Sequence, residues 1–165
     1  MNRERLERLR GLLIDDAANE KGVTFNLQTW TAKWDHEAET SKNGVPFETL
    51  EMNCGTSACA MGLAMLDPVF QSEGLQHRLD VSFRPMIVPF YMGYSEYEAG
   101  AKFFEITGDA AEWLFGPWNY PQDKRRGAEA EVLVAERIQK LLDGVQLHKD
   151  RHLGYVTEKT GIWEK

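Results

Sequence analysis

Two cysteines are the side chains in this sequence best placed to do chemistry. Cys54 and Cys59 lie in the stretch NCGTSACAMGLA, residues 53–64, and the Gly-Thr-Ser step between them is typical of the entry to a helix. The free N–H groups and the dipole at a helix N-terminus stabilise a thiolate and so activate a cysteine. Cys54 is therefore a candidate nucleophile, with the N–H groups of Gly55 and Thr56 lining an oxyanion hole.

A cysteine nucleophile also needs a general base, for which the histidines are the candidates. The sequence contains His36, His77, His148 and His152. None of them lies in a stretch that identifies it as the partner of Cys54, and the CGTSAC segment differs from the nucleophile motifs of known cysteine hydrolases. A cysteine-dependent hydrolase or transferase that uses Cys54 is therefore the alternative function, and the balance favours a protein that is not an enzyme.

The same two cysteines, together with His148 and His152, are ligand types that suit tetrahedral zinc. However, the Cys-x-x-x-x-Cys spacing is wider than in zinc knuckles, and the two histidines lie in a polar tail. A reducing cytosol also argues against a disulfide between Cys54 and Cys59. We expect no metal and no cofactor.

Packing is the interpretation of this motif that we favour. Reduced cysteine behaves as a small hydrophobe that is usually buried. Small residues in the same segment keep it thin enough for another part of the chain to approach closely: Ala58, Ala60, Gly62 and Ala64. We predict a central helix that is capped by Thr56 or Ser57 and runs to about Leu66. It ends there because Asp67 precedes a proline and is pushed out of the helical region.

Hydrophobic periodicity predicts two helices before this motif. The first spans residues 3–20, and its apolar face consists of Leu6, Leu9, Leu13 and Ala17. A short second helix, capped by Thr24 or Asn26, carries Trp30 and Trp34 one turn apart as core residues.

The second half of the chain combines a hairpin with further helices. Leu79, Val81 and Phe83 alternate with polar residues, which predicts a strand in a short hairpin around residues 78–91. The helices expected after it are one in which Ser95 forms a capping box with Glu98, one capped by Asp109 that ends at Gly116-Pro117, and one from about Asp123 to Leu142. The sequence thus predicts a mainly α protein of the α+β class, a single compact helical domain over residues 1–165 with one short hairpin.

Composition limits the classes of function. The hydrophobic fraction of 42% is ordinary for a globular protein, and the net charge of −7 is spread along the chain rather than gathered in a block. That distribution argues against nucleic acid as a partner and is too dilute for a DNA mimic. No apolar run approaches the roughly 18 residues that cross a bilayer, and the N-terminal stretch lacks the features of a signal peptide. We therefore expect a cytoplasmic protein.

Three pieces of the sequence, in this order, resemble a family of small uncharacterised bacterial and phage proteins. They are Phe25-Asn-Leu-x-x-Trp30, Cys54-Gly-Thr-x-x-Cys59-x-x-Gly62-x-Ala64 and Leu114-Phe115. The resemblance spans roughly residues 25–142, and it implies a shared fold without a known activity or substrate. In that pattern an aromatic residue or a histidine often stands between the glycine and the alanine, where this chain has Leu63.

An aromatic loop is the positive indication of function. In GPWNYP, residues 116–121, Trp118 and Tyr120 belong to the residue types favoured at interface hot spots. The alternative, in which both rings fold back onto the core, is equally compatible with the sequence. We expect a non-catalytic cytosolic protein that binds another protein through Trp118 and Tyr120, and a phage-related accessory factor is the specific form of this hypothesis.

Overall fold

The computed structural model describes residues 1–19, 23–28, 30–33, 56–80, 86–150 and 154–159, and this part of the chain forms an α+β fold. Its helices are α1 (Arg3–Asn19), α2 (Ala60–Leu66), α3 (Pro68–Ser72), α4 (Glu96–Phe104), α5 (Gly108–Phe115) and α6 (Gly127–Leu142), with the short 3₁₀ helices η2 (Pro117–Asn119) and η3 (Gln122–Lys124). Its strands are β1 (Val23–Phe25), β2 (Thr31–Lys33), β3 (Thr56–Ala58), β4 (Gln76–Asp80), β5 (Met86–Tyr91), β6 (Tyr94–Ser95), β7 (Leu147–Lys149) and β8 (Val156–Glu158).

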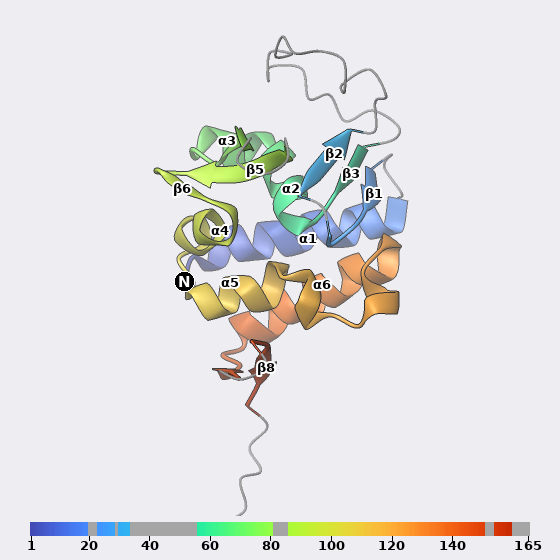
Figure 1. Ribbon diagram of the computed structural model, residues 1–165, viewed down its shortest axis with the longest axis vertical. Coiled ribbons are helices and arrows are strands. Elements are labelled where there is room, and N and C mark those ends of the chain that lie inside the picture. Colours follow the sequence, from blue (N-terminus) through green and yellow to red (C-terminus); the bar gives the residue numbers. More distant parts are fainter. Residues whose placement is uncertain (20–22, 29, 34–55, 81–85, 151–153, 160–165) are drawn as a thin grey trace, which may run out of the picture.

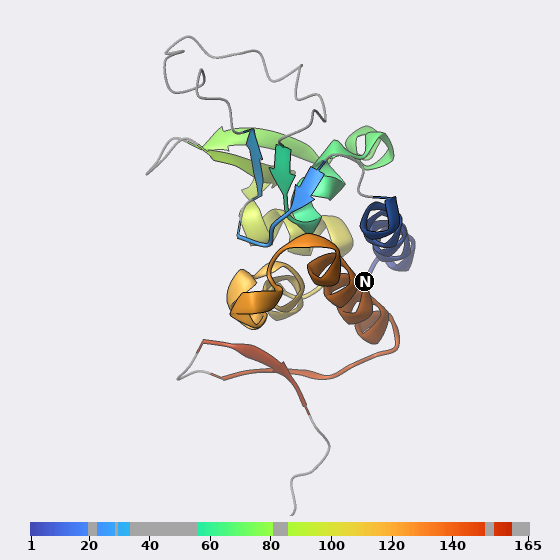
Figure 2. The ribbon, with the colours of Figure 1, turned by 90° about the vertical axis from the view of Figure 1, so that its right-hand side faces the viewer.

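A mixed sheet contains the first six of these strands. The strand order is β1-β3-β2-β5-β4, and β6 pairs with β5. β1 and β3 run parallel, whereas the pairs β3–β2, β2–β5, β5–β4 and β5–β6 are antiparallel. Figures 1 and 2 show the sheet on one side of α1, α4, α5 and α6, and the separate hairpin β7–β8 beyond the helices. The fold is therefore not all-helical, because this sheet extends well beyond the single hairpin that the sequence predicted.

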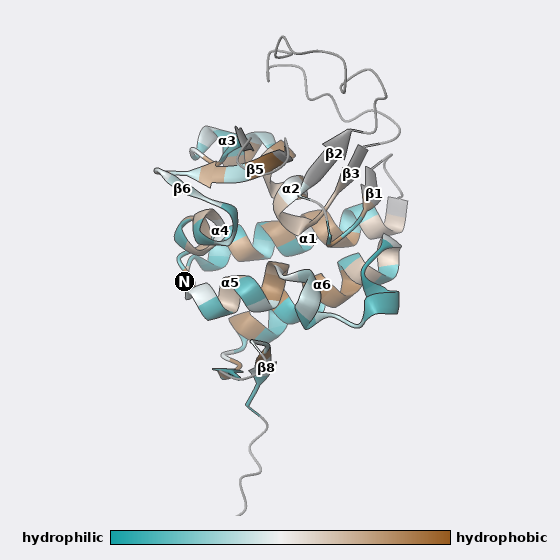
Figure 3. Ribbon diagram, in the orientation of Figure 1, coloured by the Kyte–Doolittle hydropathy of each residue, from teal (hydrophilic) through white to brown (hydrophobic). Residues whose placement is uncertain are grey.

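The antiparallel helices α1 and α6 pack along their length. Leu6, Leu9 and Leu13 of α1 are fully buried, as the periodicity predicted. Where α1 begins, the Arg3 guanidinium donates a hydrogen bond of 2.8 Å to the carbonyl of Leu142, the last residue of α6. Figure 3 shows hydrophilic and hydrophobic residues alternating along α1 and α5, which is typical of helices that cover a core with one face.

An ion pair joins α1 to the junction between α2 and α3. Two nitrogens of Arg8 donate to the two carboxylate oxygens of Asp67, at 2.9 and 2.7 Å. Asp67 also caps α3, because it accepts hydrogen bonds from the N–H groups of Val69 and Phe70. Burial alone would raise the pKa of Asp67, but the bonds from Arg8 and the backbone outweigh it and hold that pKa below its ordinary value. The predicted end of the central helix at Asp67-Pro68 is confirmed.

The predicted hairpin is also confirmed. β4 and β5 pair antiparallel, from Gln76 opposite Phe90 to Asp80 opposite Met86. β4 lies at the edge of the sheet, whereas β5 has neighbours on both sides and accommodates Pro89 opposite His77. Val81 and Phe83, which the alternating pattern included, and Pro85 lie outside the described residues.

The prediction of a short helix that carries Trp30 and Trp34 is wrong. The strands β1 and β2 flank Trp30, and Trp34 lies outside the described residues. Asn26 does not cap a helix: its side-chain oxygen accepts a bond of 3.0 Å from the N–H of Gln28, and its own N–H donates to the carbonyl of Ala58. The backbone of this segment thus finds its partners in β3, and this pairing overrides a weak helical pattern.

The starts of four helices also differ from the predictions. Thr56 and Ser57 belong to β3, so α2 begins at Ala60 with Cys59 in the N-cap position. Thr107 rather than Asp109 caps α5, and its hydroxyl accepts from the N–H of Ala110. The side chain of Ser95 makes no capping bond at α4, and α6 begins at Gly127, after the turn η3, rather than near Asp123.

A close backbone contact holds the segment before β2 on α2. The carbonyl oxygen of Trp30 accepts a hydrogen bond of 3.3 Å from the N–H of Cys59, the residue that precedes α2. The same oxygen lies over Gly62, where a Cβ atom would be only 1.8 Å away. A side chain at this position would therefore displace a backbone carbonyl, so the close approach expected at Gly62 is present and its partner is Trp30.

We expect Gly62→Ala to lower the free energy of unfolding by about 1–3 kcal/mol, because overpacking forces the backbone of Trp30 away from α2. Gly11→Ala is the matched control, since Gly11 lies within α1 and a Cβ atom there would meet nothing within 4 Å. It should stabilise the protein by about 0.5–1 kcal/mol. Denaturant unfolding of both variants gives the measurement, and equal effects of the two substitutions would contradict the contact.

Candidate functional site

The structure describes only Cys59, His77 and His148 of the cysteines and histidines considered above. Cys54, His36 and His152 lie outside the described residues, so the geometry of the Cys54 alternative is not defined. His77 lies in β4 and His148 in β7. Among the described residues, no group of histidine, cysteine, aspartate and glutamate is arranged to hold a metal ion.

Cys59 is a packing residue, as we predicted. It is free and only 1% exposed, and its thiol faces the carbonyl of Trp30 at 3.8 Å. Burial raises the pKa of this thiol to about 11, and the nearby backbone N–H groups only partly offset that effect. Cys59 is therefore neutral at physiological pH and is not a nucleophile in this conformation.

Three aromatic rings form a row that continues from this contact, and we call Trp30, Tyr97 and Trp118 the aromatic strip. The centroids of the Trp30 and Tyr97 rings are 4.7 Å apart, with 58° between their planes. Those of Tyr97 and Trp118 are 5.3 Å apart, at 67°. The rings come from the residue before β2, from the first turn of α4 and from η2, so the strip joins segments of the chain that are far apart in sequence.

Trp118 is the ring of the strip that is most open to solvent, at 40% exposed, while Trp30 and Tyr97 are half-buried. The other predicted binding residue, Tyr120, is only 3% exposed. Its hydroxyl donates a hydrogen bond of 2.7 Å to the carbonyl of Leu114, and the guanidinium of Arg137 lies 3.8 Å from its ring centroid. The structure thus combines both alternatives for this loop: Trp118 is at the surface and Tyr120 belongs to the core.

The backbone around Trp118 is held firmly. The N–H of Gly116 and the side-chain amide of Asn119 both donate to the carbonyl of Glu112, at 2.7 and 2.8 Å. A Cβ atom on Gly116 would lie 2.5 Å from that carbonyl oxygen and 3.0 Å from the Trp118 ring, so glycine is required. Arg137 of α6 donates to the carbonyl of Asn119, and this bond fixes the far end of η2.

Two of the elements around the aromatic strip also carry glutamates. Glu96 directly precedes Tyr97, and Glu112 lies on α5 before the loop that carries Trp118. Burial raises the pKa of Tyr97 above its ordinary value, and smaller electrostatic effects of Cys59, Glu96 and Glu112 act in the same direction. Lys149 of β7 pairs with Glu112 at 2.8 Å and lies 3.9 Å from Asp109.

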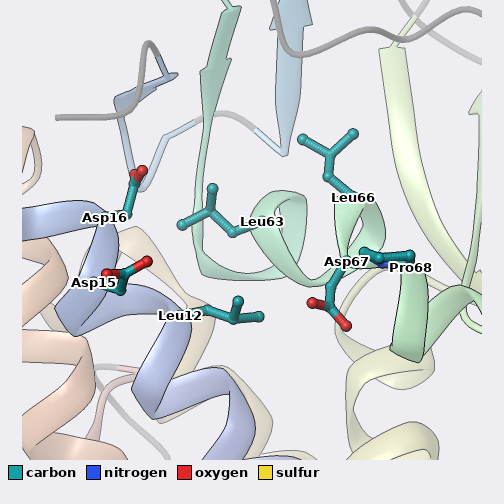
Figure 4. Close-up of a pocket in the computed structure, with 7 residues that line it drawn as sticks. All are labelled: Leu12, Asp15, Asp16, Leu63, Leu66, Asp67 and Pro68. Atoms are coloured by element: carbon teal, nitrogen blue, oxygen red, sulfur yellow. The ribbon is translucent and has the colours of Figure 1, made fainter. Parts of the chain in front are cut away.

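A hollow of about 240 Å³ opens between α1 and the α2–α3 junction (Figure 4). Its apolar wall consists of Leu12, Leu63, Leu66 and Pro68. The carboxylates of Asp15, Asp16 and Asp67 complete the lining, and that of Asp67 is bound by Arg8 and by backbone N–H groups. Of the three carboxylates in the hollow, that of Asp67 therefore already serves to join α1 to α3.

Asp16 also belongs to a buried carboxyl pair between α1 and α6. Asp16 is 8% exposed and Glu131 is 3% exposed, and their side chains are hydrogen-bonded to each other. Burial raises the pKa of Glu131 to about 8, and the neighbouring Asp16 adds to this rise, so the pair holds a proton at neutral pH. Glu131 Oε1 has no hydrogen-bond partner among the described residues.

The chain matches no protein-family profile, no curated protein and no solved structure. The resemblance to small bacterial and phage proteins therefore stays a prediction. None of the helices in the described part of the chain is both long and apolar enough to cross a bilayer.

We expect the free energy of unfolding to fall as the pH rises from about 5 to 9, because folded Glu131 keeps a proton that the unfolded chain has lost. Glu131→Gln should remove this dependence and be more stable than the wild type at pH 9 by about 1–3 kcal/mol. Denaturant unfolding across this pH range gives the measurement, with Glu136→Gln on the exposed face of α6 as the control. Parallel pH profiles for wild type and Glu131→Gln would contradict the shared proton.

Proposed function

We propose that this protein binds another protein, without catalysing a reaction, and that the aromatic strip is the binding surface. The observation that carries this proposal is the row of three rings, joined by two ring contacts, in which Trp118 is 40% exposed. Tryptophan and tyrosine bury a large apolar area and offer a polar N–H or O–H group, and for this reason they dominate the energetics of protein interfaces.

The way in which Trp118 is held supports this proposal. The bonds of Gly116, Asn119 and Arg137 fix the loop backbone, while the indole ring is supported from one side by Tyr97. A surface ring that is already ordered loses little conformational entropy when a partner covers it.

The proposed setting is the cytoplasm, where Cys59 would persist as a free thiol. A phage-related accessory factor is the more specific form of the proposal, and it rests on the resemblance of the cysteine motif. A gene neighbourhood of prophage or defence genes would support it, and a neighbourhood of housekeeping genes alone would count against it.

We expect a photo-reactive phenylalanine analogue in place of Trp118 to form a discrete cross-linked product with a second protein in the native host cell. The same analogue in place of Tyr155 is the matched control, because Tyr155 is an exposed aromatic residue, at 45%, in the segment before β8. Denaturing gels followed by mass spectrometry give the measurement. Absence of a product at position 118, or the same product at both positions, would contradict the proposed surface.

A further inference from the structure

The hairpin β7–β8 lies apart from the main sheet, on the far side of the helices (Figures 1 and 2). Its two strands have three residues each, and among the described residues they pair only with each other. A two-stranded hairpin of this kind is marginally stable in water on its own. The order of the hairpin therefore depends on the contacts that it makes with the helices.

Few contacts hold the hairpin on the helices. Within β7 and β8, Val156 is the only side chain that is buried, at 3% exposed. Lys149 pairs with Glu112 of α5 at 2.8 Å, and Glu158 pairs with Lys140 of α6 at 2.7 Å. Ion pairs that are exposed to this degree contribute little stability. We therefore expect the hairpin to open more readily than the packed helices.

Asn119, the residue that follows Trp118, joins this hairpin to the aromatic loop. Its side-chain amide donates a hydrogen bond of 2.8 Å to the carbonyl of Glu112, and its side-chain oxygen accepts one of 3.0 Å from the N–H of Val156. Its own N–H donates to the carbonyl of Gly116, at 3.1 Å. Because the side chain donates at one end and accepts at the other, these bonds fix it in one orientation. The position of β8 is thus coupled to the backbone beside Trp118.

The ion pair of Lys149 places the hairpin at this point of the loop. The ammonium of Lys149 donates to both carboxylate oxygens of Glu112, at 2.9 and 2.8 Å. The carbonyl of the same glutamate accepts from the N–H of Gly116 and from the side-chain amide of Asn119. The hairpin is therefore docked on the residue of α5 that also holds the loop.

We propose that the hairpin β7–β8 controls the binding surface through Asn119. With the hairpin docked, Asn119 holds Trp118 against Tyr97; with the hairpin open, the loop loosens and binding weakens. This inference rests on the proposed function, and it names the regulation of that surface. A ring that is ordered before binding loses less conformational entropy than one that the partner must order. Asn119 is a positioning residue, because it acts through Trp118.

The competing account is that the loop is held without the hairpin. Arg137 of α6 donates to the carbonyls of Trp113 and Asn119, and neither bond involves β7 or β8. If these bonds are sufficient, opening of the hairpin leaves the loop in place. Hydrogen exchange separates the two accounts, because a backbone amide exchanges when the structure around it opens.

The test is hydrogen exchange of the full chain, followed by NMR, in Val156→Ala, which removes two methyl groups from the buried anchor. Rates are expressed relative to the amide of Ile138 in α6. We expect the N–H of Val156 to exchange about tenfold faster than in the wild type, and those of Gly116 and Asn119 about three- to tenfold faster. Val88→Ala is the matched control, because Val88 is 1% exposed and lies in β5, and it should leave these relative rates unchanged.

A double-mutant cycle tests the role of Asn119. Asn119→Ala removes both bonds of the side chain and should accelerate exchange of the Gly116 N–H by about three- to tenfold. In that background Val156→Ala should change the rate at Gly116 by less than about twofold, because the coupling is already absent. Acceleration confined to the hairpin, or full additivity of the two substitutions at Gly116, would overturn the inference. Thermal unfolding of each variant shows that it is folded.

The cross-link at position 118 connects the hairpin to binding. Val156→Ala should lower the yield of cross-linked product per molecule by about three- to tenfold, and Val88→Ala should leave it unchanged. An unchanged yield in Val156→Ala would keep the proposed binding surface and exclude its control by the hairpin. Faster exchange of the loop in Val156→Ala, with no cross-link at position 118 even in the otherwise wild-type chain, would overturn the proposed function and leave only the conformational coupling.

Discussion

The contact between the Trp30 carbonyl and the start of α2 is the constraint on which the rest of the structure depends. A carbonyl at a packed helix start must find a donor, and this one accepts from the N–H of Cys59. The bond is possible only because residue 62 has no side chain, since a Cβ atom there would lie 1.8 Å from the oxygen. The small, buried thiol of Cys59 completes the fit from the same side.

This contact links the sheet to the candidate binding surface. Once the backbone of Trp30 is seated on α2, its ring lies against Tyr97 of α4, and Tyr97 in turn contacts Trp118. The other end of the strip is anchored independently by Arg137 of α6, which donates to the carbonyls of Trp113 and Asn119. Two separate contacts therefore bring these distant segments of the chain together. At one end Gly62 leaves room for the Trp30 carbonyl, and at the other end the Arg137 side chain binds the carbonyls near Trp118.

The sequence predicted the elements whose signals are local. α1 repeats its leucines at helical spacing, Asp67-Pro68 marks the end of α2, and the alternation near Leu79 marks a hairpin. The strands β1, β2 and β3 were missed because each has three residues, too few for a period to show, and because their pairing is set by tertiary contacts.

The candidate site was predictable only in part, for the same reason. Trp118 was found from its residue type in a turn, but Trp30 and Tyr97 lie far away in the sequence, and no spacing rule places them beside it. Tyr120 has the same chemical character as Trp118 and is nevertheless buried, because Arg137 covers it from α6. The carboxyl pair of Asp16 and Glu131 was missed likewise, since only the packing of α1 on α6 brings its two members together.

The most direct measurement of the central claim is the nuclear Overhauser effect between the Trp30 indole and the Tyr97 ring, compared between Gly62→Ala and Gly11→Ala. The ring centroids are 4.7 Å apart, so ring protons lie within range of this effect. We predict a strong signal in the wild type and in Gly11→Ala, and its loss in Gly62→Ala even where that protein remains folded. A signal of wild-type strength in Gly62→Ala would show that the aromatic strip forms without the Trp30 contact, and it would contradict the account.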